Sequence, residues 1–148
     1  MPKNKYDVLQ LKNQLCFPIY LCSKEIIRKY TPLLNELDLT YTQYIVMLYF
    51  WEKKTSNVTE LGNVLLLDSS TLTPLLKKLE TKGYLMRKRS LKDERNLEVT
   101  LTKKGEDLKD KAVFIPKKVG ECINLTNEEA MELYSLIYKV LLNVERED

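Results

Sequence analysis

The sequence predicts a mainly α-helical fold with one small β-hairpin, and three observations support this prediction. Apolar residues recur at spacings of three and four along most of the chain, which is the period of a helix with one buried face. Two short runs of β-type residues, 84–90 and 96–102, flank the charged segment LKDER, as in a hairpin with a polar tip. The length of 148 residues, 44% of them hydrophobic and 30% charged, fits a single folded domain or one subunit of an oligomer.

The first predicted helix covers residues 7–30. Its apolar positions follow helical spacing and are Val8, Leu11, Leu15, Ile19, Cys22, Ile26 and Ile27. Pro18 lies within this segment, and a proline in a helix interior removes the hydrogen bond to the carbonyl four residues back. We therefore expect a bend close to Cys16, and we expect Pro32 to end the segment.

Three shorter helices are predicted to follow. The first is YTQYIVMLYFWEK, residues 41–53, whose start either Thr40 or Thr42 can cap with a hydroxyl oxygen. The other two, VTELGNVLLL at 58–67 and DSSTLTPLLKKLETKG at 68–83, are separated by a short turn. This pair has the form of a helix-turn-helix.

The last of these helices has recognisable ends. Gly83 can adopt the left-handed conformation that terminates a helix. One of the serines and threonines near residue 70 is expected to cap the start. Pro74 then costs little, provided that the helix begins near Ser70 or Thr71, because the amides of the first turn have no helical partner.

Two long helical segments complete the chain. Thr102 can cap the first, TKKGEDLKDKAVFIPKKVGECI, which Pro116 interrupts. Thr126 and Glu129 have the spacing of a capping box at the start of the second, which stays apolar on one side through Val144.

This order of elements predicts a winged helix-turn-helix with long N- and C-terminal dimerisation helices. In that fold the second helix of the helix-turn-helix enters the DNA major groove, and the hairpin, or wing, reaches the minor groove or the backbone. The chain, 1–148, would have a DNA-binding lobe at 40–101 and helical dimerisation regions at 7–39 and 102–148, since the terminal helices carry apolar stripes too broad for the lobe to cover. A twofold homodimer would match double-stranded DNA with a pseudo-palindromic operator.

The charge distribution is consistent with DNA binding. Between Lys77 and Arg95 there are eight basic and three acidic residues, a net +5, against −2 for the rest of the chain. Such a block is expected of a phosphate-binding surface, although a solvated charged face explains the charge alone equally well. The residues expected to contact DNA are Ser69, Ser70, Thr71, Thr73, Pro74, Lys77 and Lys78 on the helix and Arg87, Lys88 and Arg89 on the hairpin.

The composition argues against several other classes of protein. Histidine is absent and no Cys-x-x-Cys pair occurs, so we expect no metal, no cofactor and no histidine-based catalysis. Three cysteines without an export signal favour free thiols. No apolar run approaches the roughly 20 residues that cross a membrane, and the start MPKNKYDVLQ lacks the apolar region of a secretory signal, so we expect a cytoplasmic protein.

Beyond these general features, the sequence resembles the MarR family of winged-helix regulators over nearly its full length. The most characteristic stretches are LDSSTLTPLLKKLE, residues 67–80, and RKRSLKDERNLEVTLTKKG, residues 87–105. Asp93 and Arg95 match the family's D-x-R wing tip, which implies that Arg95 enters a narrow minor groove while Asp93 holds its guanidinium in place. A surface salt bridge worth little is the alternative.

Within this family, the QLCFPIY segment is most similar to the organic hydroperoxide resistance (OhrR) regulators. The resemblance implies that Cys16 is a reactive thiol, hydrogen-bonded by tyrosines of both subunits and oxidised by organic hydroperoxides, which releases the DNA. The matching tyrosines are Tyr20, Tyr30 and Tyr41. Without the resemblance, a cysteine among apolar residues is more often an inert core residue. The tyrosine set favours the sensor.

The other two cysteines have less distinctive surroundings. The resemblance implies that Cys122 is a resolving thiol that forms an intersubunit disulfide with the sensor, and packing is an equal alternative. Cys22 lies six residues after Cys16, so the two face apart on a helix, and we expect Cys22 to pack. Pro18 departs from the helix formers that the resemblance leads us to expect there.

The sequence therefore predicts a redox-sensing DNA-binding transcriptional regulator, not an enzyme. We expect a repressor that leaves DNA when an organic hydroperoxide, its inducer, oxidises Cys16. Two alternatives remain open. One is a repressor released by a phenolic or lipophilic ligand, with Cys16 lining the pocket, and the other, from a different class, is a thiol peroxidase that uses Cys16.

Overall fold

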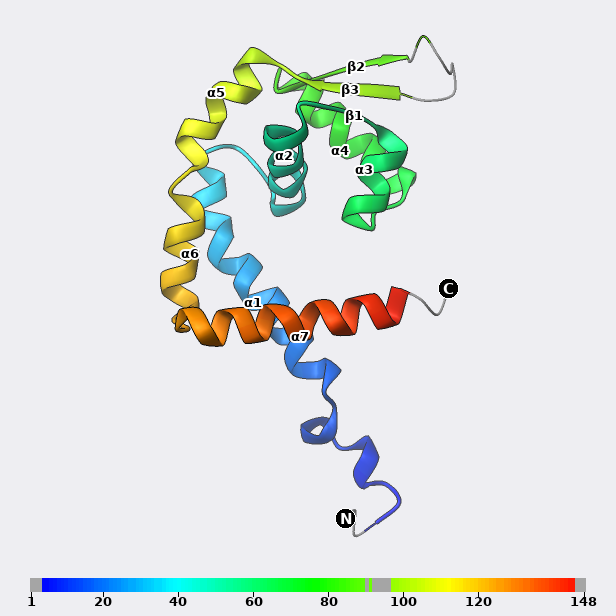
Figure 1. Cartoon of the computed structure of the whole chain (residues 1–148), viewed down its shortest axis with the longest axis vertical. Coiled ribbons are helices and arrows are strands. Elements are labelled where there is room, and N and C mark those ends of the chain that lie inside the picture. The colour runs from blue at the N-terminus through cyan, green and yellow to red at the C-terminus, as the bar shows by residue number, and fades with distance from the viewer. Residues whose placement is uncertain (1–3, 90, 92–96, 146–148) are drawn as a thin grey trace. The chain divides into compact units, whose positions relative to one another are not determined.

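A computed structural model of the chain describes residues 4–89, 91 and 97–145 (Figure 1). The chain forms two compact units, one up to Ile115 and one from Pro116 onward, and each is described by itself. Within the described residues, no helix is both long and apolar enough to cross a membrane.

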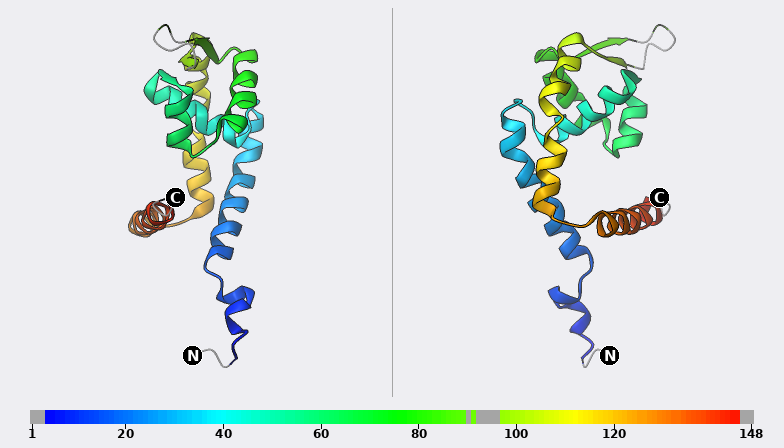
Figure 2. Two further views of the ribbon diagram at one scale, coloured as in Figure 1. Left: turned by 90° about the vertical axis from the view of Figure 1, so that its right-hand side faces the viewer. Right: turned by 60° about the vertical axis from the view of Figure 1, so that its left-hand side comes forward.

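The long N-terminal helix, α1, covers Cys16–Asn35 and begins later than the sequence predicts. Two short 3-10 helices, η1 at Asp7–Leu9 and η2 at Leu11–Asn13, precede it (Figure 2). Side chains compete for backbone acceptors in this region, since Asn13 Nδ2 donates to the Asp7 carbonyl at 2.7 Å and the Gln14 amide donates to the Val8 carbonyl. The prediction of one continuous helix from residue 7 is therefore wrong.

The two prolines of this region also act differently from the prediction. Pro18 lies in the first turn of α1, where backbone amides have no helical partner, so it causes no interior bend beside Cys16. Pro32 lies inside α1 and does not end it, because the helix continues to Asn35.

Helix α2 covers Tyr41–Lys53 and begins at a capping box. The Gln43 amide donates to Thr40 Oγ1 at 3.2 Å, and the Thr40 amide donates to Gln43 Oε1 at 3.1 Å. Of the two candidate caps, Thr40 is therefore the one used. Helix α3 follows at Val58–Leu65, capped by Asn57.

Helix α4 covers Ser69–Thr81, and its cap is Asp68, not a serine or threonine as predicted. Asp68 Oδ1 accepts a hydrogen bond from the Thr71 amide at 2.8 Å. Because α4 begins at Ser69, Pro74 lies beyond the first turn, and the helix lacks the bond that residue 74 would donate to the Ser70 carbonyl. Gly83 has φ +82, as its predicted place at the helix end requires.

The predicted hairpin is confirmed as β2, Leu85–Arg89, and β3, Leu97–Leu101. They are antiparallel, with Leu85 opposite Leu101. A third strand that the sequence does not reveal, β1 at Thr55–Asn57, pairs with the other edge of β3, so the sheet order is β1-β3-β2. A three-residue strand is too short to show an alternating pattern.

The remaining helices are α5 at Lys103–Ala112, α6 at Ile115–Ile123 and α7 at Asn127–Glu145. Thr102 caps α5, as predicted, by accepting from the Gly105 amide at 3.0 Å. The interruption expected at Pro116 is a complete break between α5 and α6. The Thr126–Glu129 capping box of α7 is also present, with bonds of 2.9 and 3.2 Å.

The core of the first unit lies where α2, α3 and α4 gather on one side of the sheet (Figure 1). Helix α2 buries Tyr44, Val46, Met47, Phe50 and Trp51, and α4 buries Leu72, Leu75, Leu76 and Leu79. The four leucines share one face of α4 because they recur at helical spacing. The opposite face of α4 is exposed.

Candidate functional site

The exposed face of α4 carries all seven residues that the sequence predicts as helix contacts to DNA. Each is solvent-exposed: Ser69, Ser70, Thr71, Thr73, Pro74, Lys77 and Lys78. Hydroxyl groups can bond to base edges or phosphates, whereas lysines supply attraction to phosphates. The arrangement of hydroxyls at the start of the helix and lysines further along suits the insertion of α4 into a DNA groove.

Asp68 shapes the start of this face, and sequence reasoning did not single it out. Its Oδ1 accepts from Ser70 Oγ at 2.7 Å as well as from the Thr71 amide. The bond from the Ser70 hydroxyl, followed by that from the Thr71 amide, holds the pKa of Asp68 below its usual range. The strong preference of aspartate for the N-cap position was the available signal.

The hairpin is fastened to α4 by an ion pair between Arg87 of β2 and Glu80 of α4. The Arg87 amide donates to Glu80 Oε2 at 3.0 Å, and Arg87 Nη2 lies 3.1 Å from Glu80 Oε1. The Arg87 side chain is 17% exposed, and its hydrogen bonds lower the pKa of Glu80. A phosphate contact by Arg87 would have to compete with this pair.

Two other residues of the predicted wing surface are exposed to solvent. Lys88 and Arg89 are exposed at the end of β2, where a DNA backbone could reach them. Asp93 and Arg95 lie outside the described residues.

Cys16 is the first residue of α1, and its thiol is exposed. The backbone amides of the first turn of a helix have no helical partners. Tyr20 follows one turn later and is 61% exposed, and Lys24 Nζ lies 6.0 Å from the centre of its ring. The three side chains therefore follow one face of α1.

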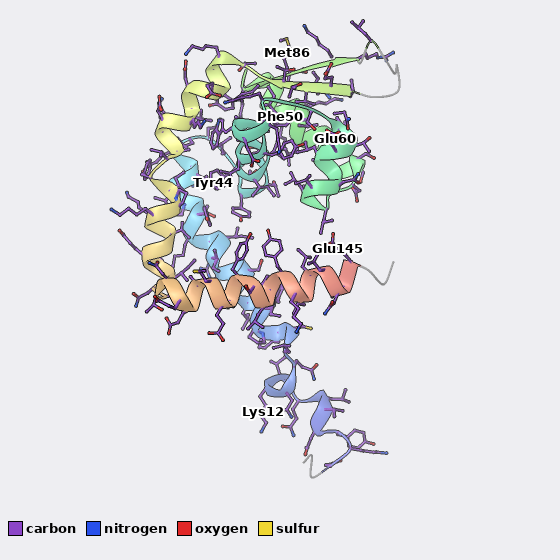
Figure 3. The ribbon with its side chains drawn as sticks, in the orientation of Figure 1. Lys12, Tyr44, Phe50, Glu60, Met86 and Glu145 are labelled. Atoms are coloured by element: carbon purple, nitrogen blue, oxygen red, sulfur yellow. The ribbon has the colours of Figure 1, made fainter. Side chains whose placement is uncertain are left out.

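A second group of tyrosines lies between the later part of α1 and the start of α2. The rings of Tyr30 and Tyr41 are 5.0 Å apart. Tyr44, labelled in Figure 3, lies 5.6 Å from Tyr30, and sequence reasoning placed it only in the helical pattern. Burial, with the neighbouring tyrosines, raises the pKa of Tyr44 to about 12, and burial also raises the pKa of Tyr30. Both hydroxyls thus stay protonated and can donate hydrogen bonds.

The fold of one chain separates these two groups. Tyr30 follows Cys16 by fourteen residues on the same helix, which is about 21 Å at 1.5 Å per residue. The structure therefore brings Tyr30 close to Tyr41, and Cys16 close to Tyr20, but it does not bring Cys16 to Tyr30 within one chain.

The remaining cysteines are also exposed. Cys22 is exposed in one chain, so it does not pack in the core of that chain, and its packing against a partner subunit stays a prediction. Cys122 lies on α6, in the second unit, and its thiol is exposed. Among the residues that the structure describes, no group of three or more acidic or cysteine side chains is placed to hold a metal ion.

Comparison with known proteins identifies relatives over most of the chain. The family model for the transcriptional regulators SarA/Rot matches residues 28–112. The organic hydroperoxide resistance transcriptional regulator of Bacillus subtilis is 44% identical over 139 residues, which cover 94% of this chain and 95% of that protein.

Solved structures give a consistent result. Reduced AbfR bound to DNA is 32% identical, with a TM-score of 0.77, over 95% of this chain and 99% of that one. A mutant of MarR from E. coli complexed with operator DNA is 26% identical, with a TM-score of 0.77, over 94% of this chain and 99% of that one. The predicted fold class and the predicted resemblance are thereby confirmed.

Proposed function

Because the chain belongs to the SarA/Rot family of transcriptional regulators, with the winged-helix fold of MarR-type proteins, we propose that it is a thiol-based redox sensor: a homodimeric repressor that leaves its DNA when an organic hydroperoxide oxidises Cys16. The observation that carries the proposal is the exposed Cys16 thiol at the start of α1, in a chain similar almost throughout to an organic hydroperoxide resistance regulator. The expectation of a regulator, not an enzyme, agrees with these relatives. A cytoplasmic location, with access to DNA, follows from this role.

The chemistry at Cys16 is a two-electron oxidation. The thiolate sulfur attacks the peroxide oxygen remote from the alkyl group and the O–O bond breaks. The alkoxide leaves with the bonding electrons and takes up a proton, which gives an alcohol and a sulfenic acid on Cys16. A second thiol, Cys122 of the partner subunit or a small cellular thiol, then attacks the Cys16 sulfur, forms a disulfide and releases water.

Exposed apolar side chains support the homodimer. Leu15, immediately before α1, is 72% exposed, and α7 exposes apolar residues along its length, with Met131 at 72%. Apolar surface of this extent is typical of an interface between subunits. We propose that segments 7–39 and 102–148 form it.

The dimer would also supply hydrogen-bond donors to the Cys16 thiol that one chain does not bring close to it. Tyr30 and Tyr41 of the partner subunit would donate hydrogen bonds to Cys16, together with Tyr20, and their rings would form an apolar wall for an alkyl hydroperoxide. Conversion of the thiolate to a sulfenic acid or a disulfide would disrupt these hydrogen bonds.

On DNA, the two α4 helices of the dimer would lie in successive major grooves of a pseudo-palindromic operator. Hydroxyls of Ser69, Thr71 and Thr73 would bond to base edges or phosphates, and Lys77, Lys78, Lys88 and Arg89 would contact phosphates. Arg95, held by Asp93, remains our proposal for the minor groove. Oxidation would change the spacing of the α4 helices and so lower the affinity for a site with fixed half-site spacing.

The test is intact mass after one equivalent of cumene hydroperoxide, with a non-reducing gel and a DNA-binding assay. Wild type, Cys16→Ser, Cys122→Ser and, as a matched control on α1, Cys22→Ser are compared. We expect that only Cys16→Ser fails to oxidise and stays on DNA. A linked dimer that Cys122→Ser abolishes means two-cysteine chemistry, and oxidation without it means one-cysteine chemistry. If the wild type keeps its reduced mass, the proposal fails and release by a ligand becomes the better account.

A further inference from the structure

We propose that Tyr44 and Trp51 form a buried connection that carries the state of the thiol site to the wing and to α4, with Tyr44 as the positioning residue for Tyr30 and Tyr41. This inference rests on the proposed function, because it requires Tyr30 and Tyr41 to belong to the thiol site.

The connection begins where three tyrosine rings meet. Tyr44, labelled in Figure 3, is 2% exposed. Its ring lies 5.6 Å from that of Tyr30 and 6.3 Å from that of Tyr41, and those two rings are 5.0 Å from each other. Protein interiors are close-packed and have little free volume, so a ring that shifts must displace the rings it touches. A change in Tyr30 or Tyr41 on loss of the thiolate would therefore reach Tyr44.

The next step runs along α2. Trp51 lies seven residues after Tyr44, nearly two turns further on the same face, and the two rings meet edge to face at 6.4 Å and 70°. Trp51 is 7% exposed, and its Nε1 donates a hydrogen bond to the Gly105 carbonyl of α5 at 2.8 Å. This directional bond joins α2 to a helix far along the chain.

Gly105 in turn lies directly against the base of the wing. A Cβ atom at this position would be 2.3 Å from the Tyr84 carbonyl oxygen. The Gly105 amide donates to Thr102 Oγ1, whose hydroxyl donates to the Gly83 carbonyl, and the Thr102 amide donates to the Tyr84 carbonyl at 3.1 Å. Gly83 and Tyr84 join α4 to β2, so a displacement of Gly105 would move the DNA-contacting elements.

Helix α2 also provides a matched control. Tyr49 contacts Phe50 edge to face at 5.3 Å, and its hydroxyl lies 3.0 Å from Ser56 Oγ. These contacts lie outside the route from Tyr44 to Gly105. Removal of the Tyr49 hydroxyl thus alters an aromatic residue of the same helix without altering the connection.

The first experiment compares DNA affinity before and after one equivalent of cumene hydroperoxide, on a duplex selected from a random pool with reduced wild-type protein. We expect oxidation to weaken wild-type binding by a factor in the usual allosteric range of about 5 to 150. Trp51→Phe and Tyr44→Leu should cut that factor about fivefold or more, with reduced-state affinity within about twofold of wild type. Tyr44→Phe, which keeps the ring, and Tyr49→Phe should respond as wild type does.

The second experiment needs no substitution in the connection, because Trp51 is the single tryptophan of the chain. Its fluorescence should change on oxidation of the wild type and stay constant in Cys16→Ser. The connection is rejected if wild-type protein releases DNA while Trp51 emission is unchanged, or if Trp51→Phe and Tyr44→Leu both keep the full oxidation response. If the wild type neither oxidises at Cys16 nor releases DNA, the proposed function itself is rejected, and the connection with it.

Discussion

Replacement of Gly105 by alanine should destabilise the protein strongly, because no space exists for a methyl group there. The added Cβ would lie 2.3 Å from the Tyr84 carbonyl oxygen and 2.7 Å from Leu101 Cδ1. Real Cβ atoms essentially never approach closer than 3.0 Å, so the two backbones must separate by at least 3.0 − 2.3, or 0.7 Å. The Leu101 side chain can adjust, but the Tyr84 carbonyl belongs to the backbone and accepts from the Thr102 amide.

The expected cost follows from these contacts. Overpacking of a filled interior costs about 1–3 kcal/mol. Strain on the bonds from the Thr102 amide to Tyr84 and from Trp51 to the Gly105 carbonyl adds about 0.5–1.5 kcal/mol for each bond that is lost. We expect the free energy of unfolding to fall by about 2–4 kcal/mol, which for this chain length lowers Tm by about 5–15 °C.

Thermal unfolding followed by circular dichroism, at fixed protein concentration, checks this value. Gly120→Ala is the matched control, since Gly120 lies in α6 and nothing described in its own chain lies within 4 Å of its added Cβ. Alanine is the better helix former, so this variant should be more stable by about 0.5–1 kcal/mol. If Gly105→Ala melts with the wild type, the close packing of α5 on the wing base is refuted.

Three further predictions concern the caps, the ion pair and the DNA surface. Thr40→Ala should lower the free energy of unfolding by about 1 kcal/mol in urea titrations and Thr42→Ala much less, since only Thr40 caps α2; equal losses would contradict the assignment. The second prediction concerns the ion pair of Glu80 with Arg87. Hydrogen bonds from Arg87 lower the pKa of Glu80 in the folded protein below its ordinary value of 4.5. The pair therefore stabilises the fold above that pH, and this stabilisation is lost as the pH falls through the folded pKa. Glu80→Gln should therefore lower the free energy of unfolding by about 0.5 kcal/mol at pH 7, a small value because solvent screens this pair. In urea titrations at lower pH, the difference from wild type should shrink progressively below pH 4.5. Lys77→Ala should weaken binding to all DNA sequences alike and reduce the slope of log K against log salt by about 1, so an unchanged slope would exclude its phosphate contact.

Local signals in the sequence were sufficient for most helices of the fold. Thr102, Thr126 and Glu129 occupy the capping positions that their spacing indicates, because a cap depends on residues within one turn of each other. The start of α1 was predicted wrongly because only apolar spacing, and no capping residue, was used to place it. Apolar spacing continues upstream of Cys16, but no cap marks a helix start near Asp7, and polar side chains there bind backbone carbonyls instead.

Contacts between distant segments were not predictable in this way. The leucine spacing of α4 correctly indicates which face is exposed, whereas the pairing of Glu80 with Arg87 depends on how β2 returns beside the helix. Likewise, Trp51 and Gly105 are 54 residues apart, and only the fold shows that one donates to the other. Charge counting treats Arg87 as part of a free basic surface, although its side chain also holds the hairpin on α4.

The proposed thiol site combines residues of two subunits, so one chain does not show it either. This has a consequence for signalling. Cys16 and Tyr30 are about 21 Å apart on one α1 helix, so the proposed site uses Cys16 of one subunit and Tyr30 and Tyr41 of the other. Those tyrosines contact Tyr44 of their own chain and, through it, the Trp51–Gly105 bond. Each thiol would then act on the α4 helix of the partner subunit. In a dimer with one Cys16→Ser subunit, oxidation of the single remaining Cys16 would therefore displace α4 of the mutant subunit.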